Sequence, residues 1–227
     1  MNRLALSCLV LLAACGGTER TRRTFPVEVS ASSAPLLTDS GWAVTLTKAN
    51  AHLASVRFFA GKVLLAQRSP WWRGLLIADA YAHPGHYIPG EALGELVQAA
   101  DVDLLATTPT SWGTASAVTG EYGSMQLTFA TGGLELEGVA TKDTQRVEFT
   151  ATFTPSGTLE GIRFERVMNT AAGFVTVLLD LNVVLSRIDF AQVGTRAKPL
   201  DSTSPAFNGL GRGVEDTGAY VTTWKDQ

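Results

Sequence analysis

The chain has 227 residues, and 18 Lys and Arg against 21 Asp and Glu give it a formal net charge of -3 at pH 7. Its hydrophobic content of 45% is enough to bury the core of one domain. The acidic balance and the lack of a basic stripe argue against nucleic acid as a partner.

Residues 1–14 have the anatomy of an export signal peptide. Asn2 and Arg3 form a short positive start, and residues 4–12 form an apolar run too short to span a bilayer as a permanent helix. The segment ends in Leu12-Ala13-Ala14-Cys15, which resembles the lipobox of bacterial lipoproteins. The resemblance implies cleavage before Cys15 and lipidation of that cysteine.

The lipobox resemblance places the protein in the bacterial cell envelope. Gly16, rather than Asp, follows the cysteine. By analogy with lipoprotein sorting, this implies a lipid anchor in the outer membrane, on its periplasmic or its surface face. Cys8 would leave with the signal, so no thiol would remain for a disulfide or a thiolate metal site.

The rest of the chain is predicted to be a flexible tether followed by one folded domain. Residues 15–24 are polar and lack an apolar period, which is typical of a tether. Residues 25–227 are predicted to form a single β-rich domain. Apolar and polar residues alternate over 42–47, 52–59, 125–129, 134–137, 147–153 and 162–167.

Breaks in this pattern predict the connections between strands. We expect a break at 48–50, a turn at Gly132-Gly133, a short helix over 91–100, and further short helices after Asn182 and within 206–220. The predicted fold class is mainly β, an antiparallel β-sandwich or flattened barrel with one or two short helices and a long aromatic loop.

Residues 69–90 form this loop, and they hold an unusual set of aromatic side chains. These are Trp71, Trp72, Tyr81 and Tyr87. Aromatic loops on β-sandwiches commonly bind sugars or proteins, although the same side chains also serve to hold a loop against the body. An envelope protein or glycan is therefore one predicted class of partner.

The chain has three histidines, and two of them lie in this loop. His83 and His86 flank a Pro-Gly pair that favours a tight turn, and His52 lies on a predicted strand, on the face shared by Val56 and Phe58. Imidazole is the commonest protein ligand for Cu and Zn. We therefore expect a Cu or Zn site formed by His52, His83 and His86, with Glu91 as an optional fourth ligand; loop histidines bonded to backbone are the alternative.

No catalytic motif is found. The chain lacks the Gly-x-Ser-x-Gly and Ser-x-x-Lys patterns, and a Ser-His-Asp set would have to draw on Ser111, Asp101 or Asp103, which no spacing singles out. We therefore expect a binding protein rather than an enzyme.

Three short stretches resemble a known family. They are Trp42-Ala43-Val44-Thr45-Leu46, Val56-Arg57-Phe58-Phe59 and Arg187-Ile188-Asp189-Phe190. Their layout is similar to that of periplasmic β-sandwich proteins of the methanobactin-associated, copper-handling type. The resemblance implies copper as the ligand, and no single residue is carried over from it.

The lipid anchor gives a first testable prediction. Replacing Cys15 by Ser removes the thiol that would be acylated, so the protein should leave the membrane fraction or accumulate unprocessed. Membrane fractionation of cells expressing each form measures this. Membrane retention at the wild-type level would contradict the lipobox assignment.

Overall fold

The computed structural model describes residues 20–32, 35–61, 63–64, 86–87, 90–193, 198–200 and 202–226. Cys15, Trp71, Trp72, Tyr81 and His83 lie outside these residues, and His86 and Tyr87 are described by their backbone alone. Among the helices of the described residues, none combines the length and apolar character that crossing a membrane requires.

Most of the described residues form one sheet of eleven strands. Its strands are β1 (Arg22–Ala31), β2 (Leu36–Leu37), β3 (Ala43–Phe59), β6 (Ala92–Asp103), β7 (Thr110–Val118), β8 (Gly120–Lys142), β9 (Gln145–Phe153), β10 (Thr158–Met168), β11 (Gly173–Leu179), β12 (Lys198–Pro199) and β13 (Tyr220–Asp226). A separate pair joins β4 (Val63–Leu64) to β5 (His86–Tyr87). The helices of the described part of the chain are α1 (Leu181–Ser186) and α2 (Pro205–Val214), with 3-10 turns η2 (Phe190–Gln192) and η3 (Thr217–Ala219).

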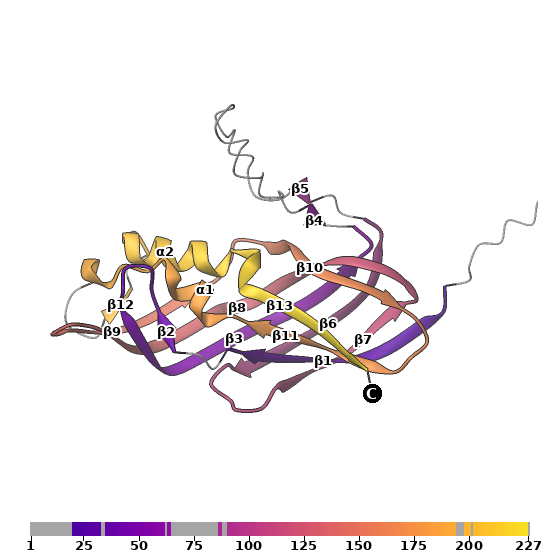
Figure 1. The fold of residues 1–227 in the computed structure, drawn as a ribbon, viewed down its shortest axis with the longest axis horizontal. Helices are drawn as coiled ribbons and strands as arrows, with labels where there is room; N and C mark the ends of the chain where they lie inside the picture. The colour runs from indigo at the N-terminus through magenta and orange to yellow at the C-terminus, as the bar shows by residue number, and fades with distance from the viewer. Residues whose placement is uncertain are drawn as a thin grey trace, which may run out of the picture.

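The sheet curls so that its edges approach each other (Figure 1). The strand order is β12-β9-β8-β3-β6-β7-β1-β11-β13, with β10 beside β8 and β2 beside β3. Side chains join β10 to β13, because Thr222 Oγ1 donates to the Arg163 carbonyl at 2.6 Å and Arg166 pairs with Asp226 at 2.8 Å. The prediction of a flattened, mainly β fold is confirmed, although the β1–β11 and β9–β12 pairs are parallel.

The inner face of the curled sheet carries an aromatic core. Phe58 packs against Phe25, Tyr122 and Phe164, with ring centroids 5.2 to 6.4 Å apart. Burial raises the pKa of Tyr122 to about 12, so this phenol stays neutral in the core. Such rings bury large apolar areas and dominate the energetics of a core.

The helices α1 and α2 lie at one end of the sheet, where α1 contacts β2 and α2 contacts β9 (Figure 1). Ser204 caps α2 by accepting from the Phe207 N–H at 3.2 Å. Added Cβ atoms on Gly209 and Gly213 would lie 2.4 and 2.0 Å from the carbonyl oxygens of Arg187 and Val184. The tail glycines therefore let α2 approach the α1 segment closely.

Three sequence predictions are wrong because the strands are longer than the alternation indicates. No break occurs at 48–50, since β3 runs for 17 residues and pairs there with both β6 and β8. No chain-reversing turn occurs at Gly132-Gly133, since both lie within β8, in a bulge between its paired residues Phe129 and Leu134. Residues 92–100 belong to β6 rather than a helix.

The predicted helix over 91–100 has an identifiable cause. Leu93 and Leu96 are both buried and lie three residues apart, which is also helical spacing. In the structure, this spacing accompanies irregularities in the pairing of β6 with β3. A bulge changes which residues face the core, so alternation is lost while the strand continues.

The folded body also begins earlier than predicted. β1 starts at Arg22, inside the segment assigned to the tether. Arg20 pairs with Glu91 at 2.6 Å, and Arg22 donates to Ser116 at 2.8 Å. Residues 20–24 are therefore attached to the sheet by their side chains and, from Arg22, by strand pairing.

The close contact of α2 with the α1 segment predicts that replacing a contact glycine of α2 by Ala destabilises the protein, although Gly to Ala usually stabilises a helix. Gly to Ala inside a helix usually adds about 1 kcal/mol of stability, but Gly213→Ala should lower the free energy of unfolding by about 2 kcal/mol, because its Cβ would overlap the Val184 carbonyl. Urea unfolding measures the change. Gly157→Ala is the control, because its Cβ would meet nothing within 4 Å; a stabilised Gly213→Ala protein would contradict the packing.

Candidate functional site

The sheet departs from regular pairing at His52. In the β3–β8 ladder, Ala51 pairs with Leu134 and Leu53 pairs with Phe129, so residues 130–133 lie opposite the single residue His52. Gly132 and Gly133 adopt φ angles of +99° and +56°, which glycine tolerates best. Bulges of this kind recur next to functional sites and re-aim side chains.

The imidazole of His52 occupies the space that the bulge provides. A Cβ on Gly132 would lie 2.8 Å from His52 Cδ2, so the ring lies directly against this glycine. The side chain of His52 is 21% exposed. The glycine therefore both forms the bulge and leaves room for the ring.

The predicted strand face of His52 is wrong. The pairing register shifts between Leu53 and Ser55, so Leu53 and Val56 are buried while His52 is only half-buried. His52 therefore shares the outer face with Lys48 and Asn50 instead of lying with Val56 on the inner face. The sheet's outer face, not its core, presents this histidine.

Asp101 fixes one edge of the imidazole. His52 pairs with Asp101 across the β3–β6 ladder, and its Nδ1 lies 2.6 Å from Asp101 Oδ1. An ionised carboxylate only accepts hydrogen bonds, so Nδ1 carries the proton in a neutral ring. Nε2 then presents its lone pair, which is the form in which histidine binds metals.

Glu135 faces the other edge of the ring. Its Oε2 lies 3.6 Å from His52 Nε2, and Nε2 is shielded from solvent without a hydrogen-bond partner. In the neutral ring, the Nε2 lone pair thus faces a carboxylate oxygen and has no donor of its own. Leaving such an atom unpaired is unfavourable, and a cation between the two would remove the penalty.

Lys48 is the cation already bound to Glu135. Its Nζ lies 2.7 Å from Glu135 Oε2, the same oxygen that faces His52. The hydrogen bond from Lys48 is the main reason that the pKa of Glu135 is lowered. The surrounding outer face also carries Asp101 and Glu137, so its field attracts positive ions.

Glu91 does not join this cluster. The Ala60 N–H donates to the Glu91 carbonyl at 3.0 Å, eight residues along β3 from His52, which corresponds to about 26 Å of strand. His83 lies outside the described residues, and His86 is placed only as backbone of β5. The three-histidine site therefore stays a prediction.

Within the part of the chain that the structure describes, no group of three or more His, Cys, Asp and Glu side chains is arranged to hold a metal ion. The described residues instead supply a pair of donor atoms, on His52 and Glu135. The alternation over 134–137 predicts that Glu135 points outward, and nothing in the sequence connects it with His52. The missing information was the strand register, which brings β8 beside β3.

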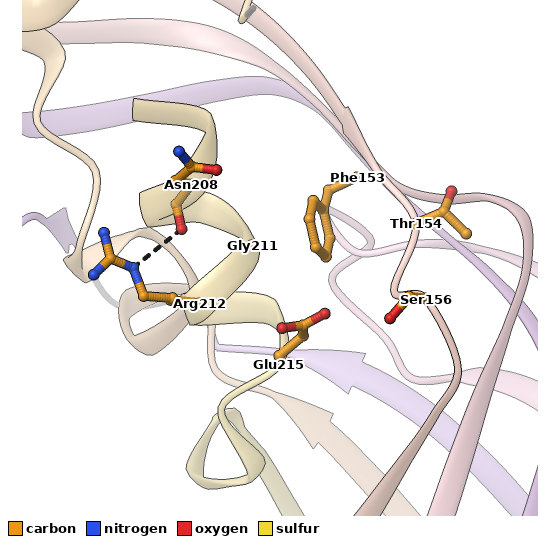
Figure 2. Close-up of a pocket in the computed structure, with 7 residues that line it drawn as sticks. All are labelled: Phe153, Thr154, Ser156, Asn208, Gly211, Arg212 and Glu215. Carbon is orange, nitrogen blue, oxygen red and sulfur yellow. Dashed lines mark hydrogen bonds between the residues drawn. The ribbon is translucent and has the colours of Figure 1, made fainter. Parts of the chain in front are cut away.

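A separate hollow of about 620 Å³ lies between the end of β9 and α2 (Figure 2). Phe153, Ser156 and Glu215 line it, and the Glu215 carboxylate lies on the side of α2 that faces them. Arg212 donates instead to the Asn208 carbonyl at 3.3 Å. The hollow contains none of the predicted site residues, so it is distinct from the His52 cluster.

Comparison with known proteins gives little further information. No protein-family model matches the chain, and no curated protein matches it in sequence. Among solved structures, it is similar to MbnP from Methylosinus trichosporium, with a TM-score of 0.37 and 9% identity, over 91% of this chain and 99% of that chain. So distant a likeness carries no argument about function, and the site is therefore interpreted from its own geometry.

The Lys48–Glu135 contact predicts a pH dependence of stability. Because the pKa of Glu135 is lowered in the folded protein, its contribution is complete above the ordinary pKa of about 4.3 and is lost as the pH falls through the lowered value. Between about pH 6 and about pH 3, the wild type should lose more free energy of unfolding than Glu135→Gln does. Urea unfolding across this range measures it, and equal losses would contradict the contact.

Lys48→Met serves as the matching variant for this prediction. It removes the main cause of the lowered pKa without removing the carboxyl group. Its pH dependence should therefore be flatter than that of the wild type, as for Glu135→Gln.

Proposed function

We propose that the protein is a lipid-anchored envelope protein that binds a transition-metal ion, Cu or Zn, with His52 as a central ligand. One observation carries the proposal. His52 Nε2 is buried without a hydrogen-bond partner and lies 3.6 Å from Glu135 Oε2, while Asp101 holds the ring from its other side.

The spacing of the two atoms suits a shared ion. Zn binds histidine nitrogen and carboxylate oxygen at about 2.0–2.2 Å, so two tetrahedral ligands stand about 3.4 Å apart. The separation of 3.6 Å requires only a small adjustment. Asp101 fills the place of the carboxylate that commonly orients a metal-binding histidine.

His52 and Glu135 would fill only two of the coordination positions of the metal ion, so further ligands are needed. Glu135 takes the role first assigned to Glu91, because it lies beside His52 and Glu91 is paired with Arg20. His83 and His86 remain the proposed further ligands, because imidazole is a preferred donor for both metals. The export signal and Cys15 supply the proposed location, with the body on an outer-membrane lipid anchor.

The alternative function is recognition of a glycan or protein through Trp71, Trp72, Tyr81 and Tyr87. None of these side chains is among those described. This function stays a prediction from the sequence, and metal binding is favoured because the arrangement of His52 supports it.

Metal binding is tested by calorimetric titration of the purified protein, carrying no histidine tag, with Zn and Cu. We expect binding to the wild type and a raised melting temperature, because a ligand of the folded state stabilises it. His52→Ala should abolish binding, Glu135→Gln should weaken it strongly, and Asp101→Asn should weaken it about 10- to 100-fold. Glu91→Gln is the control and should bind as the wild type does.

The double variant His83→Ala/His86→Ala tests the loop ligands. Loss of binding would support them, and unchanged binding would assign the remaining positions to water. A wild-type protein that binds neither metal and gains no thermal stability would reject the proposed function.

A further inference from the structure

We propose that Lys48 is a built-in competitor for the metal ion at Glu135, which makes the site one of exchange rather than of storage. This inference rests on the proposed function. It adds that the protein hands its metal on, because the same side chain that occupies Glu135 before binding returns to it on release.

The geometry requires the competition. Lys48 Nζ lies 2.7 Å from Glu135 Oε2, and this oxygen is the one that faces His52 Nε2. An ion bonded to Oε2 at about 2.1 Å would therefore stand within about 5 Å of the ammonium group. Like charges at that distance repel, so metal binding favours displacement of Lys48 from Glu135.

Lys48 has a second carboxylate to which it can move. It is paired with Glu137 in the β3–β8 ladder, and the charge of Glu137 already acts on its ammonium. The Lys48 side chain is 47% exposed, and a four-carbon stem allows its head group to move while the backbone stays paired. The exchange thus needs a change of side-chain conformation and no change of the sheet.

Because Lys48 has a carboxylate partner both before and after the metal binds, the same side-chain movement serves entry and release of the metal. When the ion binds, the ammonium moves from Glu135 toward Glu137; when the ion leaves, Glu135 is neutralised again at once. The departing metal therefore leaves no unpaired carboxylate behind. This lowers the affinity of the site and speeds release relative to a site with the same ligands and no lysine.

The test uses Zn alone, with the equilibrium constant from a chromophoric chelator and the release rate from stopped-flow mixing. Lys48→Met should bind Zn about tenfold tighter and release it correspondingly more slowly, because the competing charge is gone. Lys142→Met is the matched control, since Lys142 donates to the Ser40 carbonyl at 2.6 Å at the far end of β8. It should behave as the wild type.

Two further variants separate this mechanism from a general charge effect. Adding Lys48→Met to Glu135→Gln should give no gain in affinity, because the contested carboxylate is absent. Glu137→Gln should weaken Zn binding in the wild-type background but not in Lys48→Met, because only a displaced ammonium needs the second partner; a general charge effect would weaken both.

The outcomes separate the inference from the proposed function. If the wild type binds Zn and Lys48→Met binds it equally or more weakly, the inference is overturned and the metal site stands. If Lys48→Met and Lys142→Met gain affinity equally, only net charge matters and the inference is also overturned. If neither the wild type nor any variant binds Zn, both proposals fail.

Discussion

The long pairing of β3 with β8, which continues across several bulges, is the interaction on which the structure depends. It runs from Ala43 to Phe59 and joins the curled part of the sheet to the end covered by the helices. Because β6 pairs along the other side of β3, this strand has little freedom to move. The bulge at Gly132-Gly133 is the place where this pairing absorbs extra residues without ending, and the His52 imidazole lies against it.

Bulges in the pairing decided how completely a strand could be predicted from the sequence. β9 pairs regularly with β8, so its alternating side chains were visible in the sequence, and the helix after β11 was also predicted. β3, β6 and β8 were misinterpreted, because bulges interrupt the alternation while backbone pairing continues. Periodicity reports which side chains face the core, and a strand is defined by its hydrogen bonds.

The same reasoning explains which part of the candidate site could be predicted. His52 attracted attention as one of few histidines, yet its face was wrong, because the register shift after Leu53 separates it from Val56. Glu135 was correctly expected on the outer face, but only the register of β3 with β8 brings it near His52. The glycine pair that suggested a turn was the signal for the bulge.

The two edges of the imidazole differ in a way that bears on its role. Asp101, which holds Nδ1, is 84% exposed, so water weakens that contact and a purely stabilising role would contribute little. Nε2 lies on the side that is shielded from solvent. There, the cost of an unpaired atom and the gain from a bound cation are both larger than they would be in water. A histidine kept only for stability would gain more from the opposite arrangement, with its paired nitrogen buried and its free nitrogen in water. The observed orientation therefore favours binding over a structural role.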